Sequence, residues 1–182
     1  IHALSQEIAR LLNSSFGVIG EAANSVGGYL AGAVPFGPIE GRNAAQMLST
    51  PLKAYILAGV EPDLDIADGV SAVKSLRQAE MVAALTVFKS QSLLDLADVL
   101  LPIAPFTETA GVFVNCEGRA QAFHPVTKSA GESRAGWKVL RVIGSALELD
   151  GFDFGTIEDV RNKVLGNSVA VDSLKLGNLL AI

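Results

Sequence analysis

Three apolar runs of strand length limit the folds open to this chain. They read LKAYILAG at 52–59, EMVAALTVF at 80–88 and DVLLPIA at 98–104, and a helix-like segment separates each run from the next. None shows the strict alternation of a half-buried strand, so each suits a strand that is covered on both faces. Parallel strands need crossover connections, which are usually helices. The pattern therefore predicts an α/β fold: an open, mainly parallel sheet with helices on both faces.

A fourth apolar run, at 16–19 in FGVIG, extends this pattern toward the amino terminus. It follows a helical pattern at 1–12 and precedes a Gly-rich stretch at 21–41, which predicts a short helix and then an irregular connection. The segment RNAAQMLS at 42–49 predicts another helical turn or two. With FGVIG included, strand and helix alternate four times. We therefore expect a four-strand parallel sheet.

The segment PFTETAGVFVNCEGR at 105–119 breaks the alternation. Two short β-type runs in VFVNCEGRAQAF flank Asn115–Gly118, and Gly118 can supply the positive φ that closes a hairpin with a bulge. This predicts a β-hairpin over 112–123. Beyond it we expect two C-terminal helices, one capped by Ser133 and one opening with a capping box between Thr156 and Asp159.

Other helices are expected at 67–79 and at 90–97, the latter with Ser90 or Ser92 as its cap. The chain has 182 residues, 49% of them hydrophobic and 18% charged, which is enough for one sizeable core. We therefore expect one domain over 1–165, followed by a tail at 166–182 whose structure the pattern does not define. Because the chain starts without Met and inside a helical pattern, we expect it to be a piece of a longer protein.

Composition excludes several classes of function. The apolar runs are far shorter than the ~20 residues that span a bilayer, and no signal segment opens the chain, so we expect a cytoplasmic setting without direct membrane insertion. A net charge of −5 with scattered basic residues argues against a nucleic-acid partner. The single cysteine, Cys116, excludes an internal disulfide and cannot by itself hold zinc or an iron–sulfur cluster.

Acidic residues follow the predicted strands where a parallel sheet usually binds an anion. The stretch GEAANSVGG after the first run lacks the G-x-G-x-x-G spacing of a dinucleotide site, and four acids follow the second run within eight residues. Like charges would repel a phosphate there, so we interpret the acids as caps of the next helix rather than as catalysts. A divalent cation that bridges them to a phosphate stays an open alternative. The residues are Glu21 after the first run and Glu61, Asp63, Asp65 and Asp68 after the second.

The histidines and the cysteine show no catalytic pattern. His2 and His124 have no serine elbow or activated cysteine nearby in the sequence, so we interpret His124 as a surface or packing residue. Cys116 stands in the predicted turn with only Arg119 near enough to lower its pKa, which favours turn filler over nucleophile. We predict no catalytic, cofactor-binding or metal-binding residue in this chain.

Three segments, LKAYILAGVEPDLD, ADVLLPIAPFTETAGVFVNCEGRAQAF and GESRAGWKVLRVIGSAL, occur in an order that resembles one known family. They are similar to the carboxyl-terminal part of the large iron–sulfur subunit of bacterial NADH-quinone oxidoreductase, respiratory complex I. That region is itself similar to the molybdopterin oxidoreductases. The resemblance spans about 16–165. Their ADVVLP and E…G.F.N.EGR patterns are matched by 97–102 and by Glu108, Gly111, Phe113, Asn115, Glu117, Gly118 and Arg119.

The resemblance implies a non-catalytic structural domain that has kept a cofactor-binding fold without using it. It implies other subunits of the complex I peripheral arm as partners, and a peripheral position at the inner face of the bacterial plasma membrane. Iron–sulfur clusters, which carry electrons from NADH to quinone, are then expected in the amino-terminal part of a longer parent chain and not here. In such a family the 108–119 segment leads out of the last parallel strand, where a Glu–Arg or Glu–backbone contact would brace the exit.

Two alternatives stay open. The chain could be a fragment of a molybdopterin-dependent oxidoreductase, although Glu61 stands where those enzymes usually have Asn in a G-x-N-P loop. It could also be an unrelated nucleotide-binding α/β module. Pterin or metal in purified material would favour the first alternative, and a saturable response to nucleotides would favour the second.

Overall fold

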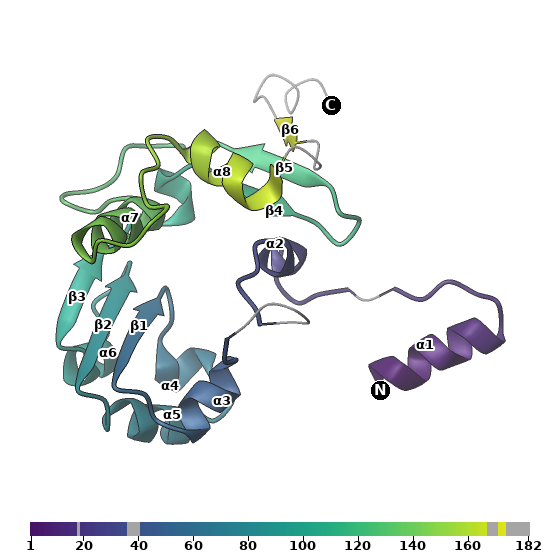
Figure 1. The fold of residues 1–182 in the computed structure, drawn as a ribbon, viewed down its shortest axis with the longest axis horizontal. Coiled ribbons are helices and arrows are strands. Elements are labelled where there is room, and N and C mark those ends of the chain that lie inside the picture. Colours follow the sequence, from purple (N-terminus) through teal and green to yellow (C-terminus); the bar gives the residue numbers. More distant parts are fainter. Residues whose placement is uncertain (18, 36–40, 167–170, 174–182) are drawn as a thin grey trace.

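The computed structural model describes residues 1–17, 19–35, 41–166 and 171–173, and Figure 1 shows how its elements are arranged. The strands are β1 (Ala54–Ala58), β2 (Met81–Thr86), β3 (Val99–Pro102), β4 (Gly111–Val114), β5 (Ala120–Phe123) and β6 (Val171–Ser173). The helices are α1 (His2–Leu11), α2 (Ser25–Leu30), α3 (Ala44–Ser49), α4 (Pro62–Asp65), α5 (Gly69–Leu76), α6 (Gln91–Leu96), α7 (Gly136–Ala146) and α8 (Ile157–Leu165), with a 3-10 turn η1 (Phe106–Glu108).

Strands β1, β2 and β3 form a parallel sheet in that order. The expected α/β class is thus confirmed, and the three runs at 52–59, 80–88 and 98–104 supply its strands. The prediction of a four-strand parallel sheet is wrong, because residues 16, 17 and 19 lie outside any strand and residue 18 is outside the described part of the chain. A short apolar run is equally compatible with an extended segment that finds no partner.

The two crossover helices lie on the same face of this sheet. Leu76 of α5 and Leu96 of α6 pack in one cluster with Tyr55 of β1 and Val82 of β2, which are neighbours in the strand register. Right-handed crossovers require this when three strands follow one another in order, since both connections then pass over the same side. The crossover helices thus cover one face, and a crossover helix on the second face would need the strand order to reverse. On that second face Ala83 and Leu85 of β2 are buried nonetheless, so other parts of the chain cover it.

Buried hydroxyl groups fasten α3 to the sheet and to α5. The Tyr55 hydroxyl donates to the carbonyl oxygen of Met47 and accepts from the N–H of Leu52, both at 2.8 Å. Ser75 of α5 donates to the carbonyl oxygen of Leu48 at 2.7 Å. These bonds satisfy carbonyls at the end of a helix of only six residues, where no further turn is available to accept them.

A second sheet contains the hairpin that the sequence predicted. β4 and β5 pair antiparallel, and β6 pairs with β5 in parallel. Gly111 sits opposite Phe123, whose ring would lie 2.5 Å from a Cβ at position 111, so a side chain there would displace the aromatic ring. β6 belongs to the tail at 166–182, for which the pattern defined no structure; the rest of that tail beyond Gly166 is outside the described residues.

The predicted helix starts are confirmed at two of three positions. Ser90 caps α6 by accepting from the N–H of Leu93, and Thr156 and Asp159 form the reciprocal capping box of α8. Ser133 does not cap α7, which begins only after Ala135. The reason lies one residue beyond Ser133: Arg134 forms a parallel bridge with Ile103, and its carbonyl oxygen accepts from the N–H of Ala104 at 2.8 Å, which holds this stretch extended.

The elements form an arc rather than one compact body (Figure 1). The parallel sheet with α3, α4, α5 and α6 makes one end of the arc, and the hairpin with α2 and α8 makes the other. α1 stands apart from both, at the end of an extended stretch. In the described ranges, no helix is both long enough and apolar enough to cross a membrane.

Matched leucines test where the core lies. Leu85 of β2 is 1% exposed and Leu64 of α4 is 73% exposed. We predict that Leu85→Ala lowers the free energy of unfolding by about 2–5 kcal/mol, because it leaves a cavity in the sheet core. Leu64→Ala should change it by less than about 0.5 kcal/mol. Urea denaturation followed by far-ultraviolet circular dichroism measures both, and equal losses would place the core elsewhere.

Candidate functional site

The loop after β1 is the place where a parallel sheet commonly meets a ligand, because strand carboxyl ends and helix N-termini converge there. In this loop Asp65 accepts a hydrogen bond from the N–H of Glu61 at 2.7 Å. Asp68 caps α5 by accepting from the N–H of Ser71 at 3.0 Å, and its hydrogen bonds with Ser71 lower the pKa of Asp68. The interpretation of the loop acids as helix caps is confirmed for Asp68, whereas Asp65 is the last residue of α4, which has no side-chain cap.

Glu21 does not join those acids. It lies in the segment that leads into α2 and lines a hollow beside the hairpin with Phe113 and Cys116. The expectation that Glu21 and Glu61 both lie where the parallel sheet would bind an anion is therefore wrong. It required a strand at 16–19 in that sheet, and the described residues of this segment lie outside any strand.

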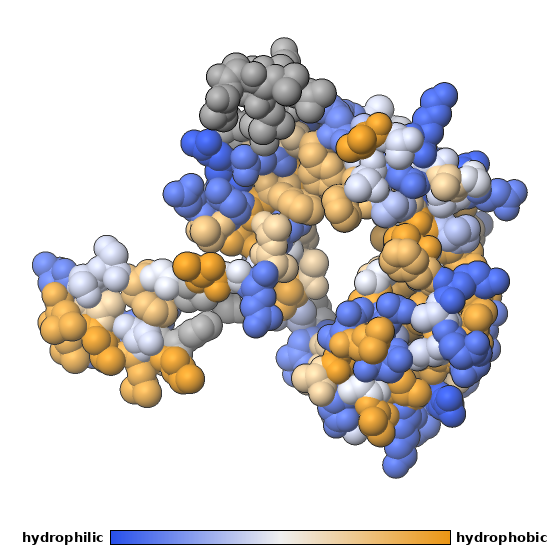
Figure 2. Space-filling view, turned by 180° about the vertical axis from the view of Figure 1, so that it is seen from behind, coloured by the Kyte–Doolittle hydropathy of each residue, from blue (hydrophilic) through white to orange (hydrophobic). Residues whose placement is uncertain are grey.

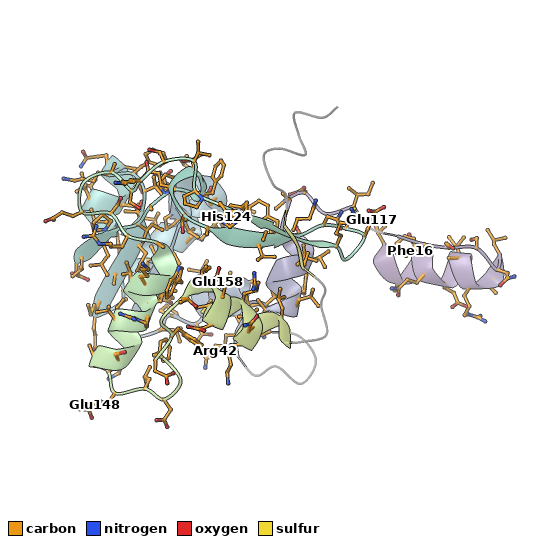
Figure 3. The ribbon with its side chains drawn as sticks, turned by 90° about the horizontal axis from the view of Figure 1, so that it is seen from above. Phe16, Arg42, Glu117, His124, Glu148 and Glu158 are labelled. Carbon is orange, nitrogen blue, oxygen red and sulfur yellow. The ribbon has the colours of Figure 1, made fainter. Side chains whose placement is uncertain are left out.

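The remaining titratable candidates are spread over separate places. His124 is exposed at the base of the hairpin, and Cys116 is exposed beside Glu117 at its tip; Figure 3 shows His124 and Glu117 at opposite ends of the two strands. His2 lies in α1. The surface interpretation of His124 is confirmed. No group of three or more metal-binding side chains occurs among the residues that the structure describes.

Asp98, at the start of the ADVLLP segment, fixes the register of the parallel sheet. Its carboxylate accepts from the N–H of Val82 at 2.7 Å, and its own N–H donates to the Val82 carbonyl oxygen at 2.9 Å. Val82 opens the buried part of β2. One aspartate thus satisfies both backbone groups of the first buried residue of the central strand, which would otherwise be left without partners at the sheet's edge.

Glu108 braces the chain where it leaves β3. Its carboxylate accepts from the N–H of Ala130 at 2.9 Å, and the hydroxyl of Ser129 donates to the Glu108 carbonyl oxygen at 3.4 Å. The neighbouring carbonyl oxygen of Thr107 accepts from the N–H of Val126 at 2.8 Å. The expected contact between this glutamate and the backbone is present, and its partner is the segment after the hairpin.

Asn115 organises the tip of the hairpin. Its side-chain oxygen accepts from the N–H groups of Glu117 and Arg119 at 3.1 and 2.9 Å. Gly118 has φ +81°, the positive value that the sequence predicted for this position, and its N–H donates to the Asn115 carbonyl oxygen. The Asn-Cys-Glu-Gly-Arg stretch is therefore a turn held by its own asparagine.

A partly polar hollow of about 440 Å³ lies between Glu108 and the first turn of α7. Arg134, Trp137 and Lys138 line it, whereas no His or Cys is among its described lining residues. The Lys138 ammonium lies 5.4 Å from the centre of the Trp137 ring. Two cations there could attract an anionic group, but the Glu108 carboxylate already accepts from the backbone and is not placed as a free base.

A family model of molybdopterin oxidoreductase matches residues 2–146 of this sequence. The chain belongs to the molybdopterin oxidoreductase family. Within it, the chain is 32% identical over 130 residues to a NADH-quinone oxidoreductase subunit from Mycobacterium bovis, which covers 68% of this chain and 16% of that relative. It is 35% identical over 78 residues to the mitochondrial NADH-ubiquinone oxidoreductase 78 kDa subunit of Neurospora crassa, covering 43% of this chain and 10% of the relative.

A different kind of relative is the alpha subunit of the F420-dependent formate dehydrogenase of Methanocaldococcus jannaschii. It is 26% identical over 114 residues, which is 62% of this chain and 17% of the relative. This molybdopterin oxidoreductase family member therefore spans less than a fifth of the length of these relatives. The resemblance noted in the sequence is confirmed both for the family and for the NADH-quinone oxidoreductase relatives.

Asn24 joins α2 to the hairpin, a role that the sequence did not predict. It caps no helix with its side chain; instead its side-chain oxygen accepts from the N–H of Val114 in β4 at 2.8 Å and ties α2 to the hairpin. A Cβ at position 27 would lie 2.0 Å from that same oxygen, so Gly27 makes the arrangement possible. In the sequence, this contact shows only as an Asn three residues before a Gly, in a Gly-rich stretch without the spacing of a phosphate-binding loop.

We predict that Asn24→Ala lowers the free energy of unfolding by about 1–3 kcal/mol, because it leaves the N–H of buried Val114 without an acceptor. Asn24→Asp keeps an oxygen in that place and should restore most of the loss. Urea denaturation measures both variants, and hydrogen exchange should show faster exchange at Val114 in the alanine variant alone. Equal stability of the Ala and wild-type chains would show that the brace contributes nothing.

The capping box of α8 predicts a pH dependence. Hydrogen bonds from Thr156, and more weakly from the Gly155 N–H, lower the pKa of Asp159. A carboxylate with a lowered folded-state pKa stabilises the fold above its unfolded pKa, about 3.9, and loses that contribution as pH falls through the folded value. We therefore expect the thermal midpoint of wild type to fall more steeply below about pH 4 than that of Asp159→Asn. The exposed Asp153→Asn should keep the wild-type slope.

Proposed function

We propose that this chain is a non-catalytic structural domain of the large peripheral-arm subunit of an NADH-quinone oxidoreductase. The observation that carries the proposal is that residues matching the family pattern form hydrogen bonds to the backbone of this chain. Asp98, Glu108 and Asn115 each match the family pattern, and each directs its side-chain oxygen at backbone N–H groups of its own fold. Residues engaged in this way hold the chain's shape and are not free to bind substrate or transfer protons.

The identity to NADH-quinone oxidoreductase relatives supports the choice of complex. The parent assembly would pass electrons from NADH through iron–sulfur clusters to quinone, with the clusters in the amino-terminal part of the parent subunit. Because the described part of this chain has no three-residue metal cluster, its contribution in this proposal is to hold cluster-bearing domains in place and to offer surface to other subunits. The position would be peripheral, at the inner face of the plasma membrane.

The family implies a molybdopterin cofactor, and the residues at the strand ends fit that group poorly. A molybdopterin carries phosphate, and the loop after β1 presents Glu61, Asp63 and Asp65, whereas the loop after β2 presents one cation, Lys89. Net negative charge beside a phosphate costs free energy. Asp65 is also already bound to the N–H of Glu61. We propose that this chain binds neither pterin nor nucleotide.

A molybdopterin-dependent oxidoreductase fragment is the second candidate, and the similarity to the formate dehydrogenase relative favours it. The hollow beside Arg134 and Lys138 is where an anionic cofactor group would find the most favourable charge. Isothermal titration of the purified chain with GDP separates the candidates. No measurable heat supports the structural domain, and a saturable isotherm that Lys138→Ala abolishes supports the cofactor-binding fragment.

The structural role is tested in the assembled complex. We predict that Asp98→Ala, which removes the acceptor of the Val82 N–H, reduces the amount of assembled peripheral arm in native gels. Glu61→Gln and Cys116→Ser should assemble normally, because Gln keeps the shape of the half-buried Glu61 side chain and Cys116 is exposed in a turn, so each should cost about 0.5 kcal/mol or less. Quinone-reductase activity per assembled complex should equal wild type in all three. A large loss of that ratio in Glu61→Gln or Cys116→Ser would contradict the proposal and restore a catalytic role.

A further inference from the structure

Two peptide bonds in this chain join an aspartate to a glycine, Asp68–Gly69 and Asp150–Gly151, and the sequence contains no Asn-Gly pair. An Asp-Gly bond can rearrange without a catalyst, because glycine has no side chain to keep its nitrogen away from the neighbouring carboxyl carbon and its backbone rotates easily. Both aspartates are exposed, so access to water does not distinguish them. The two bonds differ in how the structure holds them.

The Asp68–Gly69 bond is held at the start of a helix. Asp68 belongs to the lobe of α4, α5 and α6, where Figure 2 shows many hydrophilic side chains at the surface. Its carboxylate accepts from the N–H of Ser71 at 3.0 Å, and these hydrogen bonds lower the pKa of Asp68, which reduces the neutral form of the carboxyl group. Gly69 is the first residue of α5, and a Cβ there would lie 2.7 Å from the carbonyl oxygen of Asp63. Its backbone therefore has little room to rotate.

The Asp150–Gly151 bond lies in an exposed turn between α7 and α8. Figure 3 shows Glu148, two residues earlier, at the outer edge of the molecule. Gly151 has φ +81°, and nothing lies within 4 Å of the place where its Cβ would be. In the described part of the chain, the Asp150 carboxylate accepts no hydrogen bond. Neither the carboxyl group nor the glycine nitrogen is restrained as it is at Asp68.

We propose that Asp150 is a site of spontaneous isoaspartate formation. The Gly151 nitrogen attacks the neutral side-chain carboxyl carbon of Asp150. The N–Cγ bond forms, the Cγ–OH bond breaks, and the amide proton leaves with the hydroxyl group as one water molecule. Water then opens the succinimide ring. Attack at the side-chain carbonyl restores aspartate, whereas attack at the main-chain carbonyl leaves the chain running through Cβ and Cγ. The step needs no oxidant or co-reactant, and the inference does not depend on the proposed function.

The rearrangement lengthens the backbone between two contacts with α7. On one side of the turn, the N–H of Leu149 donates to the carbonyl oxygen of Gly144 at 2.9 Å. On the other side, the Phe152 ring packs so closely over Gly144 that a Cβ there would lie 2.2 Å from it. Isoaspartate inserts one more carbon atom into the chain between these two contacts. The expected consequence is that Phe152 is displaced from α7.

Peptide mapping of the purified chain after prolonged incubation in neutral buffer tests the proposal. Trypsin places Asp150 in the peptide 142–161 and Asp68 in the peptide 54–74, and electron-transfer fragmentation identifies isoaspartate in each. We expect isoaspartate to accumulate at Asp150 roughly two- to thirty-fold faster than at Asp68, the rate equivalent of one helix cap. In urea, where α5 is unfolded, the two rates should converge. No isoaspartate at Asp150, equal rates in the folded chain, or a difference that persists in urea would overturn the proposal.

A matched pair of variants tests the consequence for α7. Asp150→Glu should block the reaction, because the longer side chain would have to close a larger ring, whereas Asp153→Glu in the same segment should leave accumulation at Asp150 unchanged. Hydrogen exchange at the Leu149 N–H should become faster as wild type and Asp153→Glu age, and should stay constant in Asp150→Glu. Unchanged exchange in a chain shown to carry isoaspartate would overturn the displacement of Phe152.

Discussion

The structure depends on one constraint: a backbone N–H that leaves water must find an acceptor. A short helix or strand leaves a large share of its N–H groups unpaired at its ends. The elements here are short: α3 and α6 have six residues each, and β3 and β4 have four. In this chain polar side chains supply the acceptors. Asp98 accepts a hydrogen bond from an N–H at the start of β2, and Asn24 accepts one from an N–H of the edge strand β4. Glu108, just after β3, accepts one from the N–H of Ala130. The fold is therefore a set of short elements joined by side-chain hydrogen bonds rather than by long ladders.

This explains how signature residues of an oxidoreductase family can serve a chain for which we propose no catalytic role. A residue that satisfies a buried N–H cannot be lost without leaving that group unpaired, whether or not a cofactor is bound nearby. Asn115, which accepts from two N–H groups in one turn, illustrates the point. Family patterns of this kind report how the chain folds. Catalysis has to be argued from side chains whose polar atoms are still free.

Sequence reasoning worked where one physical signal dominated. Continuous apolar runs identified β1, β2 and β3, the positive φ required at Gly118 identified the hairpin, and the spacing of Thr156 and Asp159 identified the start of α8. It failed where two signals competed. FGVIG has a strand-like composition but no partner edge in the described structure, and Ser133 resembles a helix cap while Arg134 is held extended by Ile103. Both outcomes depend on neighbours distant in sequence, which local pattern cannot supply.

The candidate site shows the same division. That Asp68 would cap the following helix could be predicted from its position, whereas the separation of the loop acids from Glu21 could not, because it depends on where the segment before α2 runs. The local sequence pattern also could not predict which face of the sheet each crossover helix covers. Which side a crossover helix covers follows from strand order, and strand order is a property of the whole chain.

The bond between Asn24 and Val114 also has a consequence for the order in which the molecule forms. The two residues are 90 positions apart, so closing this contact encloses half of the chain in one loop. Loop-closure entropy makes such long-range contacts late and slow compared with local hairpins and helices. The β4–β5 hairpin and the β1–β3 sheet can each form from nearby residues. The attachment of α2 to β4 instead joins segments half a chain apart, so we expect it to form after those local units.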